Sequence, residues 1–295
     1  MRVILPTVIT PATLTASNVL ENDAPAWSST VTYTKGQTVL VDRKVYEALG
    51  VGTNLNKPPA TEPTFWLDTG FDNRWRMFDQ KVGTLTERAT PLVVKLTPGI
   101  VSDMALLNVD AESVDVVMKL GSATVWSASM DLRSSETVLD WYDYFFMPFR
   151  AKTDAVFTDM PPYATAELTI TIAKPLNPVA VGTLIVGTAI NLGGTLSSPK
   201  IGINDYSKKE PDLWGDYYVV ERAFSKRMSA EVLVDNKMLD EVFRTLAKYR
   251  ATPLLWSGGI GRFSSLIVYG FYKSFELDIA FSTHSHCSLD IEGLT

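Results

Sequence analysis

The chain has a single cysteine and no long run of apolar or basic residues. With Cys287 alone, neither an intrachain disulfide nor a thiolate metal cage can form, which favours folding in a reducing cytoplasm. No window approaches 18 uninterrupted apolar residues, so no membrane span is expected. The first residues are broken by Pro6 and Pro11, which does not fit a secretion signal.

Basic residues are too scattered to follow a phosphate backbone. The net charge is −6, and the longest basic runs are the pairs Lys208-Lys209 and Lys226-Arg227. Nucleic acid is therefore not expected as a partner. Three motifs are also missing, namely G-x-S-x-G, a glycine-rich phosphate loop and H-E-x-x-H. The sequence predicts neither an enzyme nor a bound cofactor.

What the chain has is aromatic residues, 11% of the total with seven tryptophans, and strand-like alternation. Between residues 73 and 195 apolar and polar residues repeat with period two, as in Leu168, Ile170 and Ile172. Roughly eight short strands are expected there, and the aromatic run Trp141 to Met147 is counted among them. Their number and spacing predict a jelly-roll-like β-sandwich.

The two ends of the chain have a different character. Residues 1–22 read as an extended arm, because two prolines block a helix. Its apolar residues are predicted to pair with the sheet edge of a neighbouring subunit. These residues are Val3, Ile4, Leu5, Val8 and Ile9. The alternative is that the arm packs on its own sandwich. Residues 196–295 predict an α+β unit with one amphipathic helix, from Met238 to Tyr249, capped by Asp235 or Asn236. The whole chain is thus predicted to be mainly β.

Residues 23–72 form a miniature β module, with two aromatic-marked strands around a turn and a closing tryptophan. The pattern comprises Trp27, Tyr33, Gly36, Val39, Tyr46, Ala48 and Trp66. It resembles the chitin-binding type of module in carbohydrate-binding families 5 and 12. Those modules stack sugars on tryptophans just after the second tyrosine, where this chain has Leu49-Gly50.

The resemblance implies a small attachment domain and nominates sugar-binding residues: Tyr46, Phe65, Trp66, Trp27 and Tyr33. Flat rings match the apolar faces of sugars. The alternative is that these rings form the module's own core, because so small a domain must bury its largest side chains.

The wider layout resembles tail-tip or baseplate proteins of tailed bacteriophages and prophages. It combines the arm, the module, the run W-L-D-T-G-F-D-N-R-W-R-M-F-D (66–79), the sandwich and the terminal C-S-L-D-I-E-G-L (287–294). The resemblance implies a virion protein made in the host cytoplasm and assembled as a ring of three or six copies. Its implied partners are the tail tube, the hub, the fibres and a host-surface glycan.

Two other functions remain open from the sequence. One is a cell-wall-active glycoside hydrolase with an appended binding module, using carboxylates such as Asp140 and Asp143 beside Trp141 and Tyr144. The other is a free-standing carbohydrate-binding lectin. His284 and His286 would share one face of a strand, but no third ligand lies nearby in sequence, so no metal site is predicted.

Overall fold

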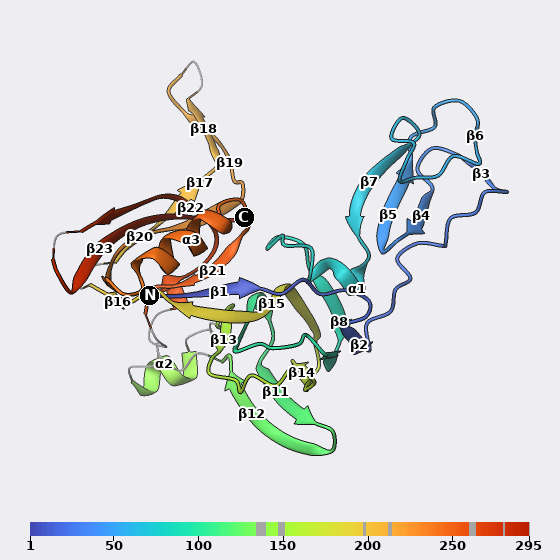
Figure 1. Ribbon diagram of the computed structural model, residues 1–295. Coiled ribbons are helices and arrows are strands. Elements are labelled where there is room, and N and C mark those ends of the chain that lie inside the picture. Colours follow the sequence, from blue (N-terminus) through green and yellow to red (C-terminus); the bar gives the residue numbers. More distant parts are fainter. Residues whose placement is uncertain are drawn as a thin grey trace.

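The protein is seen here in a computed structural model that describes residues 1–133, 140–146, 151–196, 199–211, 214–259, 264–279 and 281–294. It is mainly β, with several antiparallel sheets and one main helix, α3 (Leu239–Lys248). Figure 1 shows the small module set apart from a body that contains the sandwich and the C-terminal unit. The predicted fold class is confirmed.

The body is organised around one large sheet of eleven strands. Its main path runs through β13 (Ala155–Phe157), β10 (Asp103–Asp110), β15 (Pro178–Asn191), β1 (Arg2–Pro6), β21 (Leu254–Ser257), β22 (Ile267–Asp278), β23 (His284–Gly293), β20 (Phe224–Asp235) and β16 (Gly194–Thr195). Two further strands branch from it: β8 (Thr86–Ala89) pairs with β15, and β17 (Lys200–Asp205) pairs with β20.

A second sheet of five strands packs against the β13–β10–β15 end of the first. Its order is β12 (Ala123–Asp131), β11 (Ser113–Leu120), β14 (Glu167–Ala173), β9 (Leu92–Leu96) and β2 (Leu14–Ser17). The predicted alternation holds, since Leu168, Ile170 and Ile172 are buried in the core between the two sheets. The chain crosses between the sheets at most connections from β9 to β15, as it does in jelly rolls.

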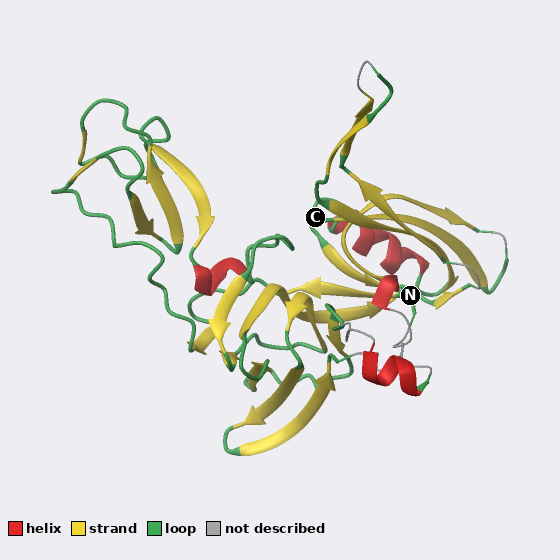
Figure 2. Cartoon of the chain, turned by 180° about the vertical axis from the view of Figure 1, so that it is seen from behind, coloured by secondary structure: helices red, strands yellow, loops and turns green. Residues whose placement is uncertain are grey.

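Alternate residues of the large sheet serve different cores. In β1, Val3 joins the core beneath α3, whereas Ile4 points to the opposite face. In β15, Leu184 belongs to the sandwich core and Ile185 to the same cluster as Ile4. The large sheet curls into a half-barrel. The buried side chains on this second face form a separate cluster: Ile4, Ala105, Leu107, Ile185, Leu255 and Tyr269. In the C-terminal unit the strands also curve around α3 (Figure 2).

The N-terminal segment is not a free arm. β1 lies inside the large sheet and pairs with β15 on one side and β21 on the other. Val3 and Ile4 are buried, and both hydrogen-bonding edges of the strand are used within the chain. This geometry corresponds to the alternative of packing on the chain's own sheet. It also makes β1 the strand that joins the sandwich to the C-terminal unit.

Two local predictions were wrong. The run beginning at Trp141 forms a short helix, α2 (Trp141–Phe146), in which rings four residues apart pair: Trp141 with Phe145 and Tyr142 with Phe146. Residues 147–150 lie outside the described part of the chain.

The cap of the main helix was also misplaced. α3 begins at Leu239 after Met238, which makes no side-chain cap. Asp235 instead accepts a hydrogen bond from the Lys237 amide, and Asn236 is bonded to Phe281 and Ser285. Both side chains hold the turn that precedes the helix, so neither is free to cap it.

The remaining elements are short. The module contains β3 (Thr32–Tyr33), β4 (Thr38–Val41), β5 (Lys44–Ala48), β6 (Asn54–Leu55) and β7 (Trp66–Phe71), and α1 (Asn73–Arg76) follows it. A two-stranded ribbon, β18 (Lys208–Pro211) with β19 (Tyr217–Val220), projects from the C-terminal unit (Figure 1). A 3₁₀ turn, Ser264–Leu266, precedes β22.

Candidate attachment module and its junction with the body

The module's core is built from the rings nominated as sugar-binding residues. Tyr33 and Trp66 meet edge to face with centroids 5.1 Å apart, and Trp66 is only 3% exposed. The Trp66 indole N–H donates to the Lys57 carbonyl, and the Tyr33 hydroxyl accepts from the Ser28 amide. Both polar groups are thus satisfied inside the module, as buried aromatic residues require. These two rings do not form an open stacking platform.

The other three nominated rings are partly buried at the margin of this core. Trp27, Tyr46 and Phe65 pack against it without being enclosed. The Lys57 ammonium lies 5.0 Å from the centre of the Phe65 ring, so one side of that ring is occupied by a cation. The Leu49 amide donates to the Phe65 carbonyl, and Leu49 and Val51 are both exposed. The edge at Leu49 and Val51 is therefore aliphatic, with Phe65 as its aromatic member.

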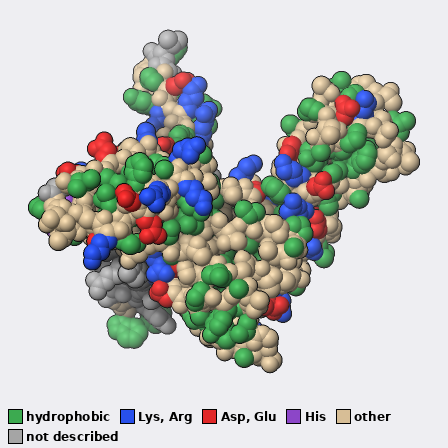
Figure 3. Space-filling view, viewed as in Figure 1, with side chains coloured by type: hydrophobic (Ala, Val, Ile, Leu, Met, Phe, Trp, Pro, Cys, Tyr) green, Lys and Arg blue, Asp and Glu red, His purple; other side chains and the backbone are tan. Residues whose placement is uncertain are grey.

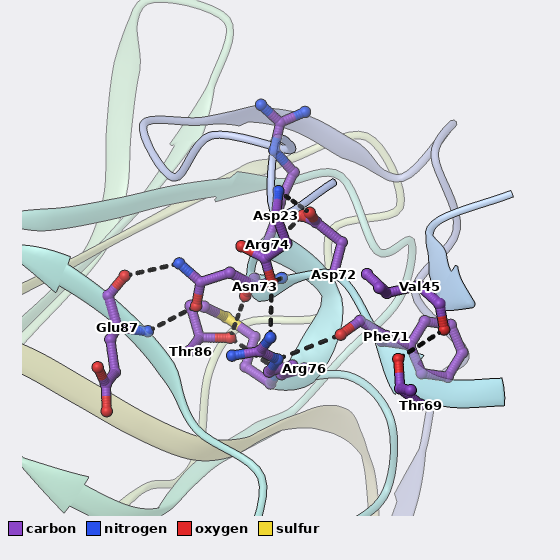
Figure 4. Close-up of polar contacts among 11 residues, drawn as sticks. Asp23, Val45, Thr69, Phe71, Asp72, Asn73, Arg74, Arg76, Thr86 and Glu87 are labelled. Carbon is purple, nitrogen blue, oxygen red and sulfur yellow. Dashed lines mark hydrogen bonds and ion pairs between the residues drawn. The ribbon is translucent and has the colours of Figure 1, made fainter. Parts of the chain in front are cut away.

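Asp72 fixes the end of the module to the body. Its side chain is completely buried and caps α1 by accepting from the Arg74 amide at 3.2 Å. Its other oxygen accepts from the Asp23 amide at 3.0 Å, on the segment that enters the module. The chain thus enters and leaves the module through one carboxylate (Figure 4).

Asp23 and two arginines extend this contact. The Asp23 carboxylate accepts from the Asn73 amide at 3.0 Å and pairs with Arg76 at 2.5 Å. Arg74 donates to the Val19 carbonyl and pairs with Glu21 at 3.3 Å. Figure 3 shows basic and acidic side chains gathered where the module meets the body. The entering and leaving segments are therefore bonded to each other along several residues.

Asn73 and Thr86 continue the network into the body. The Asn73 side chain donates to the Glu87 carbonyl and accepts from the Glu87 amide, both at 2.8 Å, so that it binds β8 as another strand would. The Thr86 hydroxyl donates to the Asn73 carbonyl and accepts from the Met77 amide. Because β8 is part of the large sheet, the module's stem is attached to the main body and not to a loop.

A cation–aromatic contact completes the junction. The Arg43 guanidinium lies 4.9 Å from the centre of the buried Trp75 ring. The Arg43 carbonyl also accepts a hydrogen bond from the Asp72 amide. We call Asp23, Asp72, Asn73, Arg74 and Arg76 the junction cluster. In the sequence the run 66–79 contributes only to a resemblance, although Asp72 ahead of N-R-W-R is a recognisable helix cap.

The five residues predicted to contact a neighbouring subunit lie in different environments in the structure. Val3, Ile4 and Leu5 lie in β1 within the chain's own sheet, and Ile9 contributes to the sandwich core. Val8 alone projects outward, at 72% exposure. Of the five, it is the residue still available to a partner.

The mouth of the half-barrel holds a cavity of about 260 Å³. Its walls are mainly apolar and include Leu107, Ile267 and Tyr269, while Lys226 pairs with the nearly buried Asp154 at 2.6 Å beside it. Burial, with a smaller effect of Asp79, raises the pKa of Tyr269 to about 12. Ligand pockets usually enclose roughly 300–1,000 Å³. This cavity is smaller, and its one close charged pair is already matched.

Other candidate chemistry is limited in the described residues. None of them form a group of three or more His, Cys, Asp or Glu placed to hold a metal ion. The His284 and His286 rings lie 6.3 Å apart, and His284 stacks on Phe281. The side chains of Asp143 and Tyr144, proposed for a hydrolase, lie outside the described part.

Among the described helices, none has the length and apolar character needed to cross a membrane. Comparison with protein-family models, curated proteins and solved structures finds no match for this chain.

Proposed function

We propose that this chain is a structural protein of a phage tail tip or baseplate that presents a small attachment module in a fixed orientation. Its activity is binding and not catalysis. In this role it assembles with the tail tube, the hub or the fibres, and with further copies of itself in a ring of three or six. It resides in the virion tail after synthesis in the host cytoplasm.

The junction cluster is the observation that carries this proposal. A module that only increased the local concentration of an enzyme would work on a flexible tether. Here the module is joined to the body by a buried carboxylate, a helix cap and paired hydrogen bonds to β8. Such a connection transmits orientation and force, which suits a component of a particle that must meet a surface at a set angle.

The module's contact surface is the margin around Phe65. Trp66 and Tyr33 are used for the core, so the rings left to meet a partner are Trp27, Tyr46 and Phe65, the last of them beside the exposed Leu49. A host-surface glycan stacked on Phe65 is one partner of this surface, and an apolar patch on a fibre protein is the other. Both uses fit an attachment role.

Location in the particle tests the proposal directly. Antibodies against the purified chain, used on intact virions in electron microscopy, should label the cell-contacting end of the tail. Label on the capsid, or none on the particle with the protein free in the lysate, would sink the assignment.

The module's partner is tested with the full chain on a glycan array and against purified fibre protein. Phe65→Ala should abolish whichever binding is found, and Val31→Ala, which removes another exposed apolar side chain of the module, is the matched control. Turnover of labelled peptidoglycan or chitin by the wild-type chain would replace the proposal by the hydrolase.

A further inference from the structure

Two histidines and a carboxylate share one face of the sheet beside the turn between β22 and β23. His284 and His286 are two residues apart in β23, so their side chains project from the same face. In the pairing of β22 with β23, Asp278 stands directly opposite His286. Opposite residues of an antiparallel pair lie on one face with their Cβ atoms about 5 Å apart. The strand pairing therefore adds a carboxylate to the histidine pair.

Contacts from the turn before β23 hold the His284 ring. Its Nδ1 lies 3.0 Å from the Thr283 hydroxyl, and the Phe281 ring stacks on its face with centroids 4.7 Å apart. Asn236 fixes this turn, because its amide donates to the Thr283 carbonyl and its side chain donates to the Phe281 carbonyl. When Nδ1 of His284 carries the proton, it donates to Thr283 and leaves Nε2 as an acceptor. A histidine that binds a metal is usually oriented through its second nitrogen in this way.

The Phe281 ring covers the two histidines without separating them. Its centre is 4.7 Å from that of His284 and 5.9 Å from that of His286, while the two imidazole centres are 6.3 Å apart. The three centres thus form a triangle, and Phe281 lies to one side of the line that joins the imidazoles. A metal ion binds an imidazole at nitrogen, in the plane of the ring, so stacking on the face of His284 does not compete with it.

We propose that His284, His286 and Asp278 bind a divalent transition-metal ion, with Zn²⁺ as the ion best matched to them. Imidazole nitrogens and a carboxylate are zinc ligands, and water can complete a tetrahedral set. The three side chains do not converge on one point in this structure. Two imidazoles on one zinc ion have ring centres roughly 5 Å apart, because each Zn–N bond is about 2.1 Å. Binding therefore requires the His286 ring to approach His284 by about 1 Å and the Asp278 side chain to turn towards them.

The carboxylate that can turn is Asp278 and not Asp235. Asp235 stands opposite His284 in the pairing of β20 with β23, but its carboxylate accepts from the Lys237 amide at 2.9 Å. It is thus used by the turn before α3. Asp278 is exposed, and within the described ranges no hydrogen bond or ion pair holds its carboxylate. A rotation of the Asp278 side chain therefore breaks no contact of that group.

This site goes beyond the attachment role and does not rest on it. Its ligands lie in β22 and β23 of the C-terminal unit, and none belongs to the module or to the junction cluster. A bound ion would link the ends of the two strands beside their turn. Because an ion that binds only the folded chain stabilises it by mass action, the site can be measured on the purified protein alone.

Calorimetric titration of the full chain with zinc chloride, after removal of metal by a chelator, tests the site. We expect one zinc ion per chain. His284→Ala, His286→Ala and Asp278→Asn should each weaken binding by about tenfold or more, since losing a ligand costs no less than losing an outer partner of one. Glu276→Gln is the matched control, because it makes the same charge change on the same face of β22, opposite Ser288, and should leave the affinity unchanged. A wild type without binding, or equal affinities in Asp278→Asn and Glu276→Gln, would overturn the three-ligand site.

Thermal unfolding gives a second readout that does not depend on the heat of binding. Zinc should raise the Tm of the wild type and of Glu276→Gln by the same amount. The rise should be absent in His286→Ala, and the Tm of that variant without zinc shows whether it folds. An undiminished rise in His286→Ala would place the zinc ion elsewhere on the chain and contradict the proposal.

Discussion

Arg2 and Asp103 form an ion pair of 2.7 Å that reaches across β15, from β1 to β10. The Asp103 side chain has no solvent exposure, and its carboxylate also accepts from the Ser102 hydroxyl at 2.6 Å. The pair anchors the strand that joins the sandwich to the C-terminal unit.

Removing the cation should be costly because the carboxylate cannot reach water. We expect Arg2→Met to lower the free energy of unfolding by about 2–4 kcal/mol in urea titrations, as for other buried pairs that lose one partner. Arg133→Met, which breaks the exposed pair with Asp131, should have no measurable effect. Equal losses in the two variants would show that Asp103 does not depend on Arg2.

Arg2 also lowers the pKa of an exposed carboxyl, that of Asp159. Hydrogen bonds from Arg2, and then from Thr158, hold the pKa of Asp159 below its ordinary value. Stability from this contact is therefore present above the pKa of the unfolded chain and is lost as the pH falls through the lowered folded value. In Arg2→Met the Asp159 carboxyl should titrate closer to its usual pKa in an NMR titration. An unchanged pKa would mean that Thr158 alone causes the shift.

Period-two alternation predicted strands such as Leu168 to Ile172, because every second residue of a strand faces the same core. This pattern can be read from residues that are close together in the sequence. The place of β1 is not local, since Val3 and Ile4 owe their burial to strands more than 180 residues away. The same limit applies to the junction cluster, where Asp23 and Arg76 are far apart in sequence. The module's aromatic pattern predicted a hairpin, seen as β4 and β5, but not the third strand β7 that carries Trp66. A pattern of rings also does not tell which faces are covered. Trp141 to Phe146 misled because aromatic residues favour strands but also pair at helical spacing.

Among the residues of the junction cluster, Asp72 should cause the largest loss of stability when it is replaced. Asp72→Ala removes the cap of α1 and the bond to the Asp23 amide, and we expect a loss of about 1–3 kcal/mol. Amide hydrogen exchange should rise at Asn73 to Met77 and at Asp23, while the module's own core exchanges as before. Asp68→Ala, which loses the half-exposed pair with Lys44, is the control and should change little. Faster exchange throughout the module would mean that Asp72 holds its fold and not its orientation.

Cys287 should make the protein lose stability at moderately alkaline pH. Burial raises the pKa of this thiol from 9.0 to about 11. Burial favours the neutral form, so its contribution is complete below pH 9 and is lost as the pH rises towards 11. The loss should be on the order of 2 kcal/mol in urea midpoints measured against pH. Cys287→Ala should be somewhat less stable at neutral pH but lack this fall, and an unchanged pH profile would contradict the assignment.

Tyr269 should produce a second loss at higher pH, on the opposite face of the sheet from Cys287. Its pKa is raised from 10.0 to about 12, first by burial and then by the charge of Asp79. The neutral phenol is favoured in the fold, so stability should hold up to pH 10 and fall between pH 10 and 12. In a Cys287→Ala background the thiol contributes nothing to this fall, and Tyr269→Phe should remove most of it. Tyr217→Phe makes the same chemical change on the exposed ribbon and should leave the fall intact. If Tyr217→Phe and Tyr269→Phe flatten the profile equally, alkaline unfolding begins at the surface and not at the half-barrel.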